Sequence, residues 1–261
     1  MRSTYLIIAI ASALIHSAAH FEQQDLTAKA LEPTLGRAKS ASGDAATEGE
    51  LVGTVTLAGQ PPRNRTINMA ADPECAKSHA GPAISEEVVV GAANALANVI
   101  IYISEGLGTQ AFDPPKQPVV IEQKGCQYQG HVVAIEAGQK LRIENSDSTS
   151  HNIHPIPANN REWNRSQPQG VAIEATFGRE EIAIPVKCNI HPWMKGYVAV
   201  FKHPYFAVTG KDGEFAIKSI PPGTYTITAW QEKLGTLTQK VTIGPKEEKN
   251  VEFVFKSPAG G

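Results

Sequence analysis

The sequence lacks several features that mark common classes of protein. It has no surplus of basic residues: 24 Lys and Arg stand against 26 Asp and Glu, a net charge of −2, which argues against a nucleic-acid-binding protein. It has no apolar run long enough to span a membrane comfortably. It has only three cysteines, so at least one of them has no partner for a disulfide within the chain.

The composition is nevertheless that of a folded protein rich in turns. Hydrophobic residues make up 41% of the 261 residues, which is enough for a core. Glycine and proline are frequent, with 22 and 18 residues. At roughly 150 residues per domain, the length predicts one large domain or two small ones.

The N-terminus reads as a secretory signal. Arg2 is followed by a short apolar run over 5–14, and Ser17 and Ala19 are small residues placed for cleavage after Ala19. Residues 1–19 are therefore expected to be removed, and residues 20–48, rich in Ala, Ser and Glu, are expected to be a flexible linker. We expect a periplasmic or secreted protein with no membrane span, in a compartment where disulfides form.

From residue 49 onward the chain alternates short β-type runs with turn residues. Runs such as 51–57, 97–103, 140–144, 182–186 and 224–230 are rich in Val, Ile, Thr and Tyr. Turn signals such as the sequences at 210–213 and 221–223 separate them. The pattern predicts an all-β protein built of sandwiches.

Residues that could bind a metal gather in two loops. His151 follows the predicted strand 140–144, and the sequence Cys188-Asn189-Ile190-His191-Pro192-Trp193-Met194 lies between predicted strands 182–186 and 197–201. A thiolate, two imidazoles and a thioether form a soft ligand set that suits copper, with the thioether as a weak axial ligand. This pattern predicts a centre whose geometry the protein fixes, as electron transfer requires.

These two segments resemble the cupredoxin (blue copper) family, and the short Cys-x2-His-x2-Met loop is most similar to its amicyanin-like members. The resemblance covers about 119–202 and implies a Greek-key sandwich over 105–203. It also implies one type-1 copper ion held by His151, Cys188, His191 and Met194. In this family Asn152 would brace the ligand loop, and His154 would be a neighbour of the site and not a ligand.

Other interpretations of the same residues stay open. Cys188 and His191 could form a zinc site with His151 and His154, and Met194 could be core packing. A Cys/His nucleophile is conceivable, although Met194 would have no role in one. A haem-attachment motif is excluded, because His191 stands where its second cysteine would be.

The remaining cysteines, Cys75 and Cys126, could form a disulfide in an exported protein, which would leave Cys188 as the free thiol. The alternative is a second metal site that contains Cys75, Cys126 and either His79 or His131. His131, five residues after Cys126, is therefore a possible extra ligand.

Electron transfer needs an exposed ligand edge. We expect His191 to reach the surface within an apolar patch where a redox partner protein docks. The ring of that patch would be Pro155, Ile156, Pro157, Pro192 and Trp193.

A second module flanks the first. The sequence over 206–217 and 220–230 resembles the carboxypeptidase regulatory-like (prealbumin-like) β-sandwich, whose opening pieces stand upstream at 53–61 and 96–99. We therefore expect one sandwich, formed by 49–104 and 204–258, split by the copper domain. The combination is similar to exported methylamine-utilization-like proteins. Weak carbohydrate contact through Trp230 or Tyr225 is an alternative role for this module.

The sequence thus predicts an exported copper electron carrier that is not an enzyme. A copper-handling protein without redox partners is the second hypothesis, and a partner- or carbohydrate-binding sandwich is the third.

Overall fold

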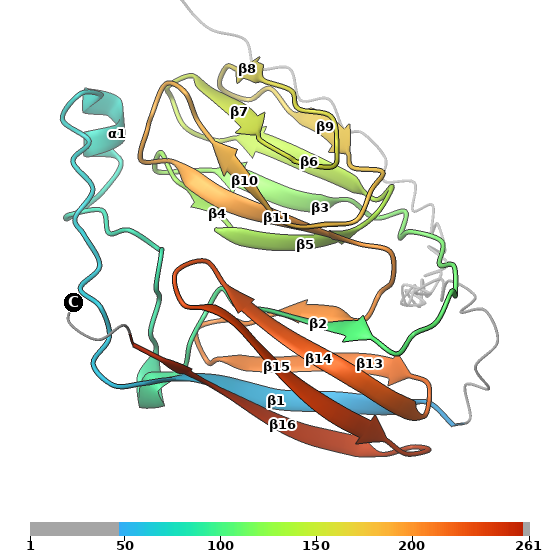
Figure 1. Cartoon of the computed structure of the whole chain (residues 1–261). Helices are drawn as coiled ribbons and strands as arrows, with labels where there is room; N and C mark the ends of the chain where they lie inside the picture. Colours follow the sequence, from blue (N-terminus) through green and yellow to red (C-terminus); the bar gives the residue numbers. More distant parts are fainter. Residues whose placement is uncertain (1–46, 258–261) are drawn as a thin grey trace, which may run out of the picture. The chain divides into compact units, whose positions relative to one another are not determined.

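The computed structural model describes residues 47–257, in which strands dominate and helices are short (Figure 1). The predicted leader 1–19 and nearly all of the predicted linker 20–48 lie outside the described residues. The all-β prediction is confirmed. Between 47 and 257 no helix is long and apolar enough to cross a bilayer.

One group of sheets, the flanking sandwich, combines the two ends of the described chain. Its sheets have the strand orders β13-β1-β16 and β12-β2-β14-β15. The strands are β1 (Gly49–Ala58), β2 (Ile100–Glu105), β12 (Phe206–Val208), β13 (Glu214–Ile220), β14 (Gly223–Gln231), β15 (Gly235–Ile243) and β16 (Glu248–Lys256).

Strand pairing joins segments from the two ends of the described chain in this sandwich. β1 pairs in parallel with β16 and antiparallel with β13, and β2 pairs antiparallel with β14 and β12. Gly53 permits the close approach of β1 and β16, because a Cβ there would lie 1.8 Å from the carbonyl oxygen of Val251. Alternate side chains of β1, among them Leu51, Val55 and Leu57, are buried in the core of this sandwich.

The central sandwich is formed by the chain between β2 and β12. Its sheets have the orders β5-β11-β10-β7-β8 and β4-β3-β6-β9. The strands are β3 (Val119–Gln123), β4 (Tyr128–Gln129), β5 (Val132–Glu136), β6 (Lys140–Asn145), β7 (His151–Pro155), β8 (Arg165–Gln167), β9 (Ile173–Thr176), β10 (Glu181–Lys187) and β11 (Lys195–Phe201).

The segment between β1 and β2 contributes to the core of the central sandwich as well. It contains helix α1 (Pro73–Lys77) and the short 3-10 helix η1 (Ala92–Asn94). Met69, Cys75 and Ala83 are buried in the same cluster as Cys188 and Met194. The stretch 49–104, expected to serve the flanking sandwich alone, therefore packs in part over the central one.

A small apolar cluster of Ile100, Val132, Ala199 and Phe201 joins strands of both sandwiches. The rings of Tyr197 and Trp230 meet there with centroids 5.2 Å apart. Tyr225 is buried, and its hydroxyl donates to the carbonyl oxygen of Pro221. Tyr225 is therefore not open to a carbohydrate ligand, whereas Trp230 is partly buried.

Candidate metal centre

Sheet pairing brings the two predicted ligand loops to one end of the five-stranded sheet. β10 pairs with β7 at Lys187 and His154, and with β11 at Lys187 and Lys195. Cys188 directly follows β10, and His151 is the first residue of β7. The loop that carries Cys188 and His191 is therefore held beside the start of β7.

Three of the predicted ligands converge on one point. Nδ1 of His151 lies 2.9 Å from Nδ1 of His191, and Sγ of Cys188 lies 3.7 Å from the same His191 atom. The three side chains are at most 2% exposed. Ligand atoms around a first-row ion, at bonds of about 2.0 Å to nitrogen and 2.3 Å to sulfur, have separations of this order.

A carboxylate accepts a hydrogen bond from Nε2 of each histidine, the ring nitrogen that does not face the other ligands. Nε2 of His151 bonds to Oδ2 of Asp147 at 2.8 Å, and Nε2 of His191 bonds to Oδ2 of Asp72 at 2.9 Å. Because a carboxylate accepts, each Nε2 carries the proton and each Nδ1 directs its lone pair at the other. Two lone pairs 2.9 Å apart require a cation between them, either a proton or a metal ion.

Asn152 organises the cysteine loop. Its Oδ1 accepts hydrogen bonds from the backbone N–H groups of Asn189 at 2.6 Å and Ile190 at 3.4 Å, and lies 3.3 Å from Sγ of Cys188. The sulfur also accepts from the backbone N–H of Asn152 and of His191. These contacts hold the sulfur and the loop that carries it in place.

The same contacts shift the pKa of Cys188. Burial alone would raise it, but hydrogen bonds from His151 and from backbone N–H groups favour the thiolate and lower the pKa to about 7. Burial would lower the pKa of His151, whereas its bonds to Asp147 and Cys188 raise it to about 9. The surrounding groups thus favour the thiolate of Cys188 and the protonated form of His151.

Met194 closes the ligand loop. Its N–H donates to the carbonyl oxygen of His191, and its carbonyl oxygen accepts from the N–H of Cys188. The side chain is 1% exposed and packs in the same core cluster as Cys188.

The other candidate ligands lie elsewhere. His154 bonds to Asn189 at 3.1 Å and to Glu162 at 2.7 Å, and His131 pairs with Glu232. Neither belongs to a group of converging ligand atoms in the part of the chain that the structure describes. The zinc set that would include His154 is not assembled.

Cys75 and Cys126 form a disulfide with sulfur atoms 1.97 Å apart, and Cys188 is free. His79 bonds to the carbonyl oxygen of Gly125. The disulfide joins helix α1 to the loop after β3, directly over the candidate centre. We refer to residues 72–78, which are α1 with its two caps, as the lid.

The lid contradicts the expected exposure of His191. The ring is 2% exposed because Asp72 contacts its Nε2 and Sγ of Cys75 lies 3.6 Å from the same atom. The other Oδ of Asp72 caps α1 by accepting from the N–H groups of Glu74 and Cys75. Sequence reasoning missed Asp72; the only local signal was an Asp-Pro pair, which starts helices in general.

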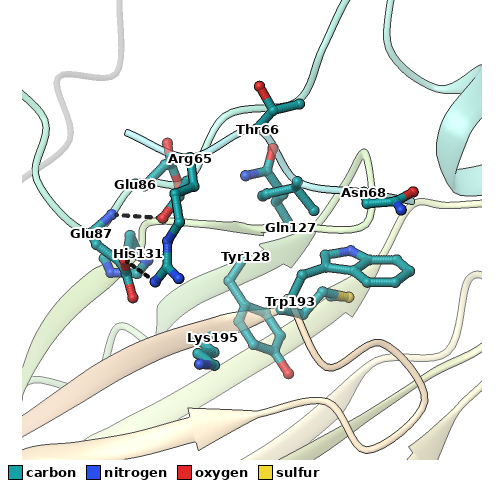
Figure 2. A pocket seen from close by; sticks show the side chains of 13 residues that line it. Arg65, Thr66, Asn68, Glu86, Glu87, Gln127, Tyr128, His131, Trp193 and Lys195 are labelled. Carbon is teal, nitrogen blue, oxygen red and sulfur yellow. Dashed lines mark hydrogen bonds and ion pairs between the residues drawn. The ribbon is translucent and has the colours of Figure 1, made fainter. Parts of the chain in front are cut away.

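A cavity of about 260 Å³ opens beside the ligand loop. Figure 2 shows Arg65, Glu86, Glu87 and His131 at one end of it and Trp193 at the other, with Tyr128 between them. The ring of Trp193 lies 5.1 Å from that of His191, and its Nε1 donates to the carbonyl oxygen of Cys126. The ligand loop is thus packed between this cavity and the lid.

Comparison with known proteins gives partial matches. Residues 196–251 match the family model described as polysaccharide lyase family 4, domain II, in place of the carboxypeptidase regulatory-like module expected for this region. No curated protein matches the sequence.

Solved structures with partial likeness include cupredoxins. A copper-containing nitrite reductase (NirK) from Thermus scotoductus SA-01 matches with 22% identity and a TM-score of 0.31, over 37% of this chain and 25% of the reductase. A purple cupredoxin from Nitrosopumilus maritimus matches with 26% identity and a TM-score of 0.28, over 31% of this chain and 98% of its own. A reduced mutant of amicyanin matches with 21% identity and a TM-score of 0.29, over 34% and 91%. This chain therefore spans only a quarter of the reductase, but nearly all of the two small proteins.

Proposed function

We propose that this chain is an exported electron carrier that holds one type-1 copper ion and catalyses no reaction of its own. The ligands would be His151, Cys188 and His191, with Met194 as the weak axial ligand. When bound, copper would supply a one-electron couple, and the protein would hold the ligands in one arrangement through both oxidation states.

The observation that supports this proposal best is the convergence of three buried ligand atoms. Nδ1 of His151, Nδ1 of His191 and Sγ of Cys188 face one another within 4.8 Å. The carboxylates of Asp147 and Asp72 fix both rings with Nδ1 inward, so little rearrangement is needed to accept an ion. One thiolate with two imidazoles favours copper over the harder ions that prefer oxygen ligands.

The partner would have to dock beside the ligand loop rather than on the His191 ring, which is buried. Ile190 is 52% exposed and Pro192 is exposed next to it. These two side chains form an apolar edge within four residues of Cys188. A small apolar contact suits a brief encounter with a redox partner.

Colour tests the type-1 centre. Purified protein given Cu(II) should develop an intense visible absorption from cysteine-to-copper charge transfer, and Cys188→Ser should abolish it. His154→Gln is the matched control and should keep the colour, because His154 faces Glu162 and Asn189. A protein that stays colourless with copper but binds zinc tightly would refute the proposal.

The burial of His191 favours a second candidate, a copper-holding protein without a redox partner. A ligand that is 2% exposed protects an ion from exchange but lengthens the path for an electron. Voltammetry separates the two functions. A fast, reversible one-electron couple supports the carrier, and an ion that stays bound but exchanges no electrons supports the holding protein.

A further inference from the structure

His191 stands between two sulfur centres. Its Nδ1 faces Sγ of Cys188 at 3.7 Å, and its Nε2 faces Sγ of Cys75 at 3.6 Å. The candidate copper site uses only the first of these faces. On the second face, toward the lid, Asp72 orients the ring, but the contact with the sulfur of Cys75 has no role in the proposed function.

On that second face the sulfur atoms of Cys75 and Cys126 and a nitrogen of His191 all lie within 4.8 Å of one another. All three residues are buried. While the disulfide is closed, the sulfurs are bonded to each other and provide no thiolate. Before it closes, the same positions hold two thiols and an imidazole, which is a soft ligand set.

We propose that the dithiol form of this chain binds a soft monovalent ion such as Cu(I) between Cys75, Cys126 and Nε2 of His191. Binding releases one proton from each thiol. The proton on Nε2 of His191 moves to Nδ1 of the same ring, and Nε2 exchanges its hydrogen bond with Asp72 for the ion. The site lies on the lid side of the His191 ring, opposite Cys188. It is a second site that shares His191 with the candidate type-1 centre but uses the other nitrogen of the ring.

Closure of the disulfide removes this site. A disulfide of an exchange partner takes up two electrons and two protons from Cys75 and Cys126; the Sγ–Sγ bond forms as the partner's own disulfide becomes two thiols. Residues Glu74, Ala76 and Lys77 of the lid are exposed, so the thiol pair lies beneath a single turn of helix. The order of the two events, metal uptake and oxidation, would then decide which site an incoming ion meets.

The test is done in the Cys188→Ser variant, which cannot form the type-1 centre, so that its outcome is independent of the proposed function. Protein made without exposure to oxidant is compared with the same protein after oxidation, and thiol counting verifies each form. Cu(I) is titrated against a coloured Cu(I) chelator under argon. We expect the dithiol form to take about one equivalent from the chelator and the disulfide form to take none.

Two further variants locate the ion. In the Cys188→Ser background, His191→Gln should lower the Cu(I) affinity of the dithiol form by about tenfold or more. The control His154→Gln should leave it unchanged, and Cys75→Ser with Cys126→Ser should lose binding. Circular dichroism checks that each variant keeps its strands.

Three results would overturn the inference. The dithiol form could bind no more Cu(I) than the disulfide form, or its affinity could be the same with and without the His191 imidazole. The third is loss of the strand signal in the dithiol form, because the site requires the folded lid.

Discussion

Removal of the Cys75–Cys126 disulfide should destabilise the protein and open the lid over Cys188. The bridge closes a loop with a sequence separation of 51 residues. For a loop of that length, chain entropy alone gives a stabilisation of about 4 kcal/mol. We therefore expect Cys75→Ala with Cys126→Ala to lower the free energy of unfolding by up to about 4 kcal/mol, measured by urea denaturation.

The same double variant should also expose the candidate centre locally. Within α1, Cys75 is the buried residue. The lid is otherwise held by hydrogen bonds that Asp72 accepts from His191 and Thr149 and that Glu74 accepts from Ser148. Because so few contacts hold the lid, we expect it to open locally at a much lower free-energy cost than global unfolding. Because the chain has three cysteines, Cys188 is the single thiol left, and its alkylation rate under native conditions measures the opening.

Leu141→Ala is the matched control for this experiment. Leu141 is fully buried in β6, away from the lid, and its truncation should cost about 2–5 kcal/mol. If alkylation of Cys188 speeds up equally in both variants, the disulfide stabilises the whole fold and the lid is not a separate gate. A disulfide variant that loses less than about 1 kcal/mol would refute the loop-entropy argument itself.

Three other substitutions test separate parts of the structure. Burial raises the pKa of Glu136 from 4.5 to about 7, so folding favours the protonated acid and stability falls as pH rises from 4.5 to 7. Glu136→Gln should abolish that fall, a difference of about 3 kcal/mol in urea denaturation between pH 4.5 and 8, and an unchanged pH profile would contradict the shift. Asn152→Ala leaves the N–H groups of Asn189 and Ile190 without their acceptor, so the metal-free protein should lose about 2 kcal/mol in the same assay. Gly53→Ala forces a Cβ against the backbone of β16 and should cost about 3 kcal/mol, whereas a neutral result would mean that β1 and β16 can separate freely.

The parts of the fold that follow local rules could be predicted from the sequence. Turns at 210–213 and 221–223 separate β12 from β13 and β13 from β14, because Gly213 adopts a φ of +71° and the two prolines stop strand pairing. The ligand loop could be found as well, since Cys188, His191 and Met194 lie within seven residues and their chemistry is distinctive. His151 could be added to this set because it follows the predicted strand 140–144.

The lid could not be predicted in this way, because the contacts that define it join residues remote in sequence. Asp72 is 119 residues before His191, and α1 is only five residues long, too short for a periodic pattern to reveal which face it buries. His131 likewise has its partner Glu232 101 residues away. Spacing within a motif says which atoms can share an ion, but says nothing about what covers them from outside.

The lid changes how the candidate centre can exchange electrons or ions with its surroundings. Nε2 of His191 donates a hydrogen bond to Asp72 and packs against the disulfide sulfur of Cys75. On an open site, a partner would approach this nitrogen. Exchange at this face therefore requires the lid to move, and the lid is tied down by a covalent bond whose state depends on the redox conditions. The edge at Ile190 and Pro192 needs no such motion, since both residues are already exposed. Electron exchange at the loop edge and ion exchange under the lid would accordingly respond to different perturbations: the first to substitution of Ile190, the second to the state of Cys75 and Cys126.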